Sequence, residues 1–237
     1  MNIEAYKKRK VQLKKEAQHY RDLCTQCLQP EFSCYCVHIK KLDPKIKFVI
    51  LMHPIEQKRR IATGRMSHLC LQNSEMIVGQ DYTDNKRVNE ILKNPECQPA
   101  VLYPGINSLN LTELSEEKKA VLFHPEKEPV LFVIDGTWAT ARKTMHASQN
   151  LKTLPQLSFN LPHKSRFRVR KQPGENCFST IEAIHHFIEL MGFHTVREHD
   201  ALITVFDKMV ERQLEFIERA WADPTLVTYR RVKHQIR

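Results

Sequence analysis

The stretch Pro129-Val130-Leu131-Phe132-Val133-Ile134-Asp135-Gly136-Thr137-Trp138 decides the predicted fold class. Its first six residues are apolar and rich in β-branched side chains, which is typical of a buried strand in a parallel sheet. Residues 139–145 favour a helix, so Asp135 is expected at the carboxyl end of a strand, where open α/β sheets bind ligands. Gly136 permits a sharp turn and the close approach of a ligand. An ordinary strand-to-helix turn, with Asp135 as helix cap and Trp138 in the core, explains the same residues on position alone.

The rest of the chain repeats this alternation of strands and helices. Strands are predicted at residues 47–52, 75–78, 99–103, 129–134 and 157–161, and helices at 4–22, 65–72, 85–92, 138–145, 179–191 and 200–221. Such alternation predicts an α/β fold with a mostly parallel sheet. Neither GxGxxG nor the P-loop motif occurs, so a glycine-rich loop for nucleotide phosphates is not expected.

The chain has 237 residues, a formal net charge of +10 and a pI of about 9.3. This balance favours a polyanionic partner such as RNA, with a merely soluble basic surface as the alternative. The candidate phosphate contacts are Lys7, Lys8, Arg9 and Lys10 of the first predicted helix, and Arg166, Arg168, Arg170 and Lys171 of a predicted extended segment. No apolar run approaches the ~20 residues of a membrane span, and the start lacks the apolar core of a signal peptide. We therefore expect a cytoplasmic protein with no membrane contact and no obligate protein partner.

Four of the seven cysteines lie within thirteen residues, as Cys24-x-x-Cys27 and Cys34-x-Cys36. Four thiolates at this spacing can surround one tetrahedral ion, and closed sites of four cysteines are usually structural zinc sites. An iron–sulfur cluster, a site in which His38 replaces one sulfur, and incidental cysteines are the alternatives. Disulfides are not expected in a cytosolic protein.

Several other segments are expected beside Asp135. Leu102-Tyr103-Pro104-Gly105 and His53-Pro54-Ile55-Glu56 each end a predicted strand, Thr63-Gly64-Arg65 follows the second of them, and Ser179-Thr180-Ile181-Glu182-Ala183 resembles a helix capping box. Carboxyl ends of parallel strands meet at one edge, and amides at a helix start suit an anionic or hydroxyl-bearing ligand. Turn formation alone explains Pro104 and Gly105, a lone His53 is usually structural, and Glu56 is expected to pair with Arg59 or Arg60.

Taken in order, these segments resemble the DTW-domain family, and most closely its tRNA-uridine aminocarboxypropyltransferases. The resemblance rests on the four cysteines, His53-Pro54-x-Glu56 with Thr63-Gly64-Arg65, Leu102-Tyr103-Pro104-Gly105, Asp135-Gly136-Thr137-Trp138, Arg168-x-Arg170-Lys171-Gln172-Pro173 and Ser179-Thr180-x-Glu182-Ala183. Each motif is weak alone, but the ordered set is specific and covers residues 22–191.

The resemblance implies a fold related to the SPOUT methyltransferases, with a C-terminal knot. It implies transfer of the 3-amino-3-carboxypropyl group of S-adenosyl-L-methionine to N3 of a tRNA uridine, which leaves 5′-methylthioadenosine. Asp135 is then the candidate base, or the acceptor that orients N3–H. The expected cofactor-binding residues are Thr63, Arg65, Leu102, Tyr103, Pro104, Gly105, Gly136, Thr137, Trp138, Ala141, Ser179, Thr180, Glu182 and Ala183. The two basic segments named above are the expected track for the tRNA backbone.

Four regions are expected: a basic helix at 1–22, a zinc knuckle at 23–44, a SPOUT-like DTW catalytic domain at 45–222 and a basic tail at 223–237. Two other functions fit the sequence. One is the same transfer, or conventional methylation, on ribosomal RNA, and the other is a non-catalytic zinc-containing RNA-binding module. The missing glycine-rich cofactor loop favours the module, whereas the pocket-forming strand ends favour an enzyme.

Overall fold

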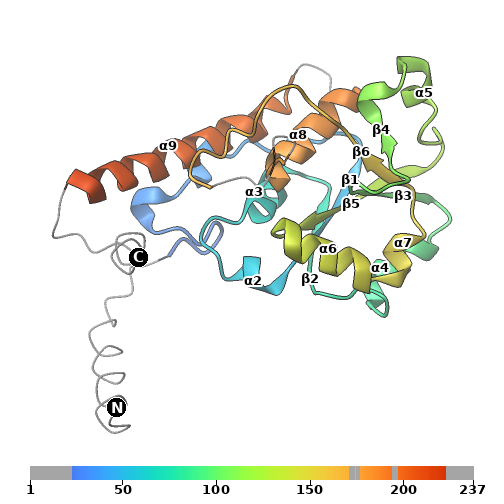
Figure 1. Cartoon of the computed structure of the whole chain (residues 1–237), viewed down its shortest axis with the longest axis horizontal. Coiled ribbons are helices and arrows are strands. Elements are labelled where there is room, and N and C mark those ends of the chain that lie inside the picture. The colour runs from blue at the N-terminus through green and yellow to red at the C-terminus, as the bar shows by residue number, and fades with distance from the viewer. Residues whose placement is uncertain (1–22, 171–173, 175–176, 194–196, 223–237) are drawn as a thin grey trace, which may run out of the picture.

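The computed structural model describes residues 23–170, 174, 177–193 and 197–222 (Figure 1). The predicted basic helix at 1–22, with Lys7, Lys8, Arg9 and Lys10, and the basic tail at 223–237 lie outside the described residues, as does Lys171. Within the described part, no helix has both the length and the apolar character needed to cross a membrane.

A single six-stranded sheet forms the centre of the molecule, and all its strand pairs are parallel. The strands are β1 (Lys47–Met52), β2 (Ser74–Val78), β3 (Cys97–Leu102), β4 (Leu109–Asn110), β5 (Glu128–Asp135) and β6 (Gln156–Ser158), in the spatial order β2-β1-β5-β3-β6-β4. The α/β class and the mostly parallel sheet are therefore confirmed. The two innermost apolar runs of the sequence, β1 and β5, pair with each other and place Met52 opposite Asp135.

Helices cover both faces of the sheet, so its central strands are buried on both sides. In β1, Phe48 and Ile50 face one core and Val49 and Leu51 face the other. The first core is covered by α3 (Thr63–Cys70), α8 (Thr180–Met191) and α9 (Asp200–Ala222). The second is covered by α4 (Lys86–Lys93), α6 (Trp138–Ala147) and α7 (Gln149–Lys152), and the two layers lie above and below the sheet in Figure 1.

The cysteine segment packs on the end of the α9 layer. Its two 3-10 turns, Glu31–Ser33 and Cys36–His38, contact α9, where the Phe32 and Phe216 rings lie 4.6 Å apart. Arg212 Nε donates to the Phe32 carbonyl at 2.9 Å. Cys27 and Tyr35 are buried in the same cluster as the α3–α8–α9 core, so this small segment gains its apolar contacts from the larger layer.

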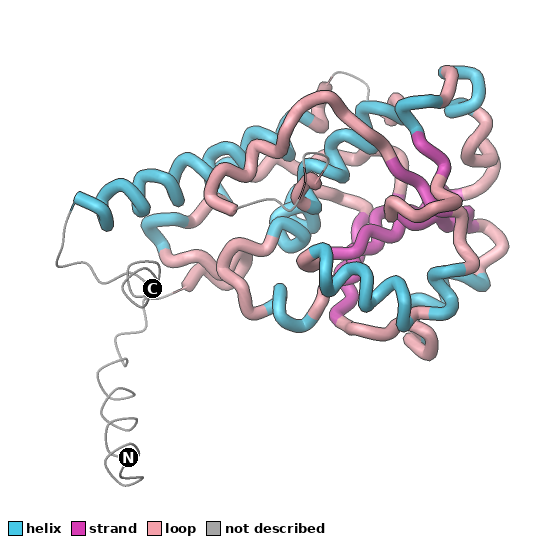
Figure 2. The backbone as a smooth tube through the Cα atoms, viewed as in Figure 1, coloured by secondary structure: helices cyan, strands magenta, loops and turns pink. Residues whose placement is uncertain are grey.

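A long connection between β6 and α8 runs beside α9 before it returns to the sheet (Figure 2). Phe167 is buried in this connection, and its ring lies 5.3 Å from that of Phe206 on α9. The sequence predicted an extended ribbon here, and that prediction is wrong. The Arg168 amide donates to the Arg166 carbonyl at 2.7 Å and the Arg170 amide to the Phe167 carbonyl at 3.0 Å, so consecutive tight turns fold the segment.

Candidate active site

A cavity of about 710 Å³ lies at the carboxyl edge of the sheet. Its walls come from the ends of β3, β5 and β6 and from the first turns of α3, α6 and α8. This is the position at which open parallel sheets bind ligands, and the volume suits a nucleoside-sized molecule. Most of the predicted cofactor-binding residues line it: Thr63, Leu102, Tyr103, Pro104, Gly136, Thr137, Trp138, Ala141, Ser179, Thr180 and Ala183.

Asp135, the last residue of β5, is buried at the floor of this cavity with only 4% of its surface exposed. Its Oδ1 accepts a hydrogen bond of 2.5 Å from the Thr180 hydroxyl on α8. Its Oδ2 is buried and has no hydrogen-bond partner among the described residues. The carboxylate therefore lies at the junction of the sheet with two helices, with its second oxygen packed beside Gly64.

Burial raises the pKa of Asp135 from its ordinary value of 3.8 to about 6. The nearby negative charge of Glu56 acts in the same direction, whereas the Thr180 hydroxyl, the Gly64 amide and the charge of Arg170 lower the pKa. Glu56 is itself buried and forms an ion pair of 2.9 Å with Arg59, as one of the two expected pairings. The Asp135 carboxyl thus titrates just below neutral pH, as suits a group that exchanges a proton.

Gly64 lets α3 approach the carboxylate closely. A Cβ added at this position would lie 2.5 Å from Asp135 Cγ, which is closer than non-bonded carbon atoms approach. The backbone of α3 therefore forms one side of the Asp135 environment, and Thr63, beside it, lines the cavity. A glycine is required here by contact rather than by backbone conformation.

The first turn of α6 forms the apolar wall of the cavity. Thr137 caps this helix by accepting a hydrogen bond from the Thr140 amide at 3.2 Å, and Trp138 and Ala141 line the cavity one turn apart. Asp135 is thus not the helix cap, because Thr137 fills that role. Leu102 and Pro104 continue the wall from the end of β3.

Three predicted cofactor-binding residues do not line the cavity: Arg65, Gly105 and Glu182. Arg65 is buried, and its guanidinium donates to the backbone carbonyls of Gln57 and Arg59 at 2.7 and 3.3 Å. Gly105 forms the turn after β3 and accepts from the Ser108 hydroxyl at 2.7 Å. Neither residue lines the cavity, and the Arg65 guanidinium is bonded to backbone carbonyls rather than placed toward a ligand.

Glu182 completes the capping box of α8 and is 1% exposed. Its Oε2 accepts from the Ser179 amide at 2.9 Å and from the Ser165 hydroxyl at 2.8 Å, and its Oε1 accepts from the Arg166 amide at 2.6 Å. The carboxylate therefore ties the long connection to the start of α8. This bonding fixes Ser179 and Thr180 beside Asp135 without exposing Glu182 to a ligand.

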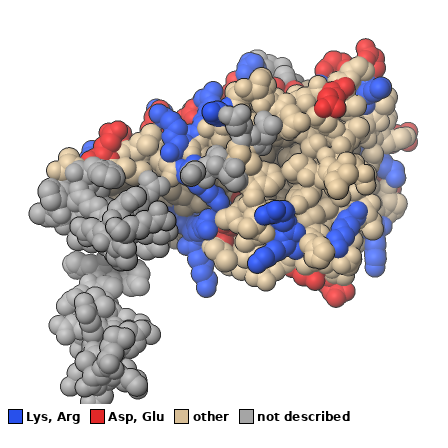
Figure 3. All heavy atoms as spheres, in the orientation of Figure 1, with Lys and Arg blue, Asp and Glu red and all other residues tan. Residues whose placement is uncertain are grey.

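The three described arginines of the predicted RNA track separate in the structure. Arg166 forms an ion pair of 2.7 Å with Asp207 on α9, and Arg168 is exposed. Arg170 lines the cavity instead. On the face in Figure 3, Lys and Arg side chains occupy the centre as well as the rim, whereas most Asp and Glu side chains lie near the margins.

Sequence reasoning missed the part of the cavity built by the end of β6 and the approach to α8. Phe159 and Phe178 line it with ring centroids 5.9 Å apart, and Ser158, Asn160 and Cys177 lie beside them. A signal was available for Phe159, because it lies within the fifth predicted strand and the carboxyl ends of all such strands share one edge. Nothing in the pattern around residue 178 marked it as part of a site.

The four clustered cysteines come together in space. Cys24 Sγ lies 3.6 Å from Cys36 Sγ, and Cys27 Sγ lies 3.6 Å from Cys34 Sγ, with all four sulfurs within 4.8 Å of one another. Four thiolates around one zinc at about 2.3 Å stand about 3.8 Å apart, so the geometry fits that ion. The backbone amides of Cys27 and Gln26 lower the pKa of Cys24 to about 6, whereas burial raises the pKa values of Cys27 and Cys36. The cluster could therefore hold a metal ion.

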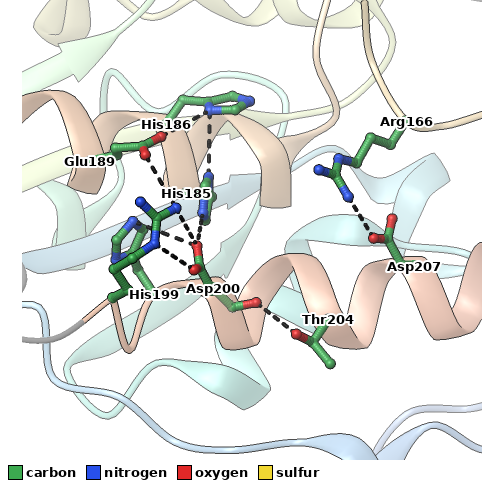
Figure 4. Close-up of polar contacts among 9 residues, drawn as sticks. Arg166, His185, His186, Glu189, His199, Asp200, Thr204 and Asp207 are labelled. Carbon is green, nitrogen blue, oxygen red and sulfur yellow. Dashed lines mark hydrogen bonds and ion pairs between the residues drawn. The ribbon is translucent and has the colours of Figure 1, made fainter.

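A buried histidine cluster lies between α8 and the start of α9 (Figure 4). His185 Nε2 contacts Asp200 Oδ1 at 2.9 Å, and His185 and His186 approach each other through their Nδ1 atoms at 3.4 Å. Arg197 already binds Asp200, with Nε 2.9 Å from Oδ2. Burial lowers the pKa of His186 to about 3, so this ring is neutral at physiological pH. The charge of Asp200 is therefore paired within the cluster, and these contacts join the two helices.

Comparison with known proteins gives relatives of one kind. The chain is 30% identical over 169 residues to a Drosophila melanogaster protein named tRNA-uridine aminocarboxypropyltransferase 2, and 25% identical over 166 residues to the Mus musculus protein of the same name. Each match covers 68% of this chain, and the chain spans only 63% of the fly protein and 54% of the mouse protein. An Arabidopsis thaliana protein named tRNA-uridine aminocarboxypropyltransferase A is 23% identical over 91% of this chain and 89% of its own length.

No solved structure matches the chain. The model of the DTW domain matches residues 21–214, which include both the cysteine cluster and every wall of the cavity. Because this match covers most of the sequence, the chain belongs to the DTW-domain family.

Proposed function

We propose that this chain is a tRNA-uridine aminocarboxypropyltransferase. It transfers the 3-amino-3-carboxypropyl group of S-adenosylmethionine to N3 of a tRNA uridine and releases 5′-methylthioadenosine. The observation that carries the proposal is the buried Asp135 carboxyl, whose pKa is raised and which lines a cavity of about 710 Å³ at the carboxyl edge of the sheet. The printed names of the fly, mouse and plant relatives support the same activity.

The cavity suits the donor because it combines an apolar wall with acidic groups. A sulfonium activates all three of its attached carbons, so selectivity depends on which carbon lies in line with the acceptor. Leu102, Pro104 and Trp138 are placed to hold the methionine and sulfonium region, and Ala141 leaves space for the S-methyl group. Backbone groups of Ser179, Thr180 and Ala183 are the candidates to bind the adenosine.

Asp135 acts on the acceptor nitrogen. Uridine N3–H is about as weakly acidic as a phenol, with a pKa near 10. A carboxylate with a pKa of about 6 accepts this proton poorly before reaction, but can take it as the new bond forms. The N3 lone pair then attacks the aminocarboxypropyl carbon that is bonded to sulfur, the bond between that carbon and sulfur breaks, and its electron pair stays on sulfur as the neutral thioether. The proton of N3 ends on Asp135.

The four-cysteine cluster is proposed to hold structural zinc. A zinc ion there would stabilise a segment of the chain that has little apolar core of its own. It takes no part in the transfer, because the cysteines do not line the Asp135 cavity.

The RNA must present a uridine whose N3–H is not engaged in base pairing, such as a loop nucleotide or one flipped from the helix. Arg166 and Arg168, with the basic segments outside the described residues, are the proposed backbone contacts. The proposal also includes a division into a knuckle at 23–44 and a catalytic domain at 45–222. It further includes a relation to the SPOUT fold with its C-terminal knot, and a cytoplasmic location.

Two differently labelled donors test it. The protein is incubated with unmodified tRNA and S-adenosylmethionine that carries label either in the methyl group or in the aminocarboxypropyl carbons. We expect label on tRNA only from the second donor, with release of 5′-methylthioadenosine. Methyl label on the tRNA would indicate conventional methylation. Label on ribosomal RNA fragments alone would indicate that the substrate is ribosomal RNA. Failure to bind S-adenosylmethionine would indicate a non-catalytic RNA-binding module. An Asp135→Asn variant should keep donor binding and lose turnover.

A further inference from the structure

The cavity holds three charged side chains: Glu56, Asp135 and Arg170. Among the described residues, Arg170 is the only cationic side chain that lines it. Two further arginines, Arg65 and Arg59, already have partners within the protein. Arg65 binds two backbone carbonyls, and Arg59 pairs with Glu56. One positive group is therefore available to a ligand that enters beside Asp135.

The turn that carries Arg170 is anchored. The Arg170 amide donates to the Phe167 carbonyl at 3.0 Å, and the Phe167 side chain is buried against Phe206. Glu182 holds the start of the same turn through the Arg166 amide at 2.6 Å. Within the described part of the chain, the Arg170 guanidinium itself makes no hydrogen bond or ion pair. A partly buried guanidinium on a fixed turn is preorganised for an anionic group.

The charges of the cavity mirror those of one class of ligand. S-adenosylmethionine carries two positive groups, its sulfonium and its α-ammonium, and one negative group, its α-carboxylate. Because Glu56 is already paired with Arg59, Asp135 and Arg170 are the acidic and the basic side chain that can complement such a ligand. An α-carboxylate near two acidic side chains is repelled unless a cation lies between them, and the planar guanidinium fork matches a carboxylate through two hydrogen bonds.

We propose that Arg170 binds the α-carboxylate of the donor's aminocarboxypropyl group, and is thus a residue that holds the transferred part of the donor rather than the RNA backbone. This inference rests on the proposed function. Because the carboxylate leaves with the transferred group, 5′-methylthioadenosine has no contact with Arg170. The residue therefore discriminates between donor and spent thioether.

Two thioethers separate this role from others. S-adenosylhomocysteine keeps the aminocarboxypropyl group, and 5′-methylthioadenosine lacks it. Calorimetry measures the affinity of both for the wild type and for Arg170→Gln. Losing a charge-assisted contact made of two hydrogen bonds should lower the affinity for S-adenosylhomocysteine by about 10- to 100-fold. The affinity for 5′-methylthioadenosine should stay within about twofold of the wild-type value. Arg170→Lys keeps the positive charge but not the planar guanidinium, so its affinity for S-adenosylhomocysteine should lie between those of the wild type and Arg170→Gln.

The matched control is Arg87→Gln, which removes the same charge from an ion pair with Glu75 outside the cavity and should change neither affinity. If Arg170→Gln lowers the affinity for both thioethers equally, or for neither, the inference is overturned while the proposed function stands. A loss of tRNA affinity with unchanged S-adenosylhomocysteine affinity would return Arg170 to the RNA surface and overturn it too. If the wild type binds neither thioether, the proposed function fails and the inference fails with it.

Discussion

Replacing Thr180 with valine tests the role of Asp135, because the Thr180 hydroxyl donates the one hydrogen bond that Asp135 receives from a described side chain, at 2.5 Å. A hydrogen bond to a charged group contributes about 1.5–3 kcal/mol, and one pKa unit corresponds to about 1.4 kcal/mol. Loss of the hydroxyl should therefore raise the Asp135 pKa by about one to two units, from about 6 to between about 7 and 8.

Activity requires the ionised carboxylate, so the acid limb of the kcat/KM profile should move to higher pH. At pH 7, Asp135 is about 90% ionised with a pKa of 6, and about 25% ionised with a pKa of 7.5, which predicts about a fourfold loss. The loss should disappear near pH 9. Release of 5′-methylthioadenosine over a pH series measures it, with Thr180→Ser, which keeps the hydroxyl, as the control. An acid limb that stays in place in Thr180→Val would refute the reasoning.

Three further predictions follow from the same contacts. Asp135 has a higher pKa in the folded state than in the unfolded chain, so it destabilises the folded state increasingly as pH rises from about 4 to about 6. Asp135→Asn should therefore raise the free energy of unfolding in urea by up to about 3 kcal/mol at pH 7 and by almost nothing at pH 4. An equal increase at both pH values would exclude this origin. Cys27→Ser should lower zinc content from about one ion per chain to none, with Cys97→Ser unchanged, and equal zinc in both variants by elemental analysis would contradict the site. Glu182→Gln should lower the free energy of unfolding by about 1–3 kcal/mol because it disturbs the bonds from Ser165, Arg166 and Ser179, and unaltered stability would show that these bonds hold nothing in place.

The central strands and long helices could be predicted because their residues carry strong local patterns. Residues 47–52 are apolar on both faces and form β1 with the predicted bounds, and the helical spacing from residue 200 continues through α9. Short elements lacked such a signal. Residues 54–57 form a helix of a single turn where no helix was predicted, and Leu109 and Asn110 pair with β6 as a two-residue edge strand.

The cavity could be predicted in outline because every parallel strand delivers its carboxyl end to one edge. Asp135 and Leu102 were found this way, and Thr180 was found from the predicted helix start. The finer assignments depended on side-chain partners that no pattern displays. Arg65 looked available for a ligand but is used by backbone carbonyls, and Arg170 looked like part of an exposed ribbon but turns into the cavity. The alternating arginines predicted an extended segment, but two tight turns fold residues 166–170, and Phe167 is buried against Phe206 on α9.

The most direct measurement is a crystal structure of the protein with S-adenosylhomocysteine bound. We expect the thioether in the cavity between Trp138 and the first turn of α8, with the Asp135 carboxyl facing the space beside the sulfur where an acceptor nitrogen would stand. A ligand bound outside this cavity, or an Asp135 carboxylate turned away from it into solvent, would contradict the proposed chemistry.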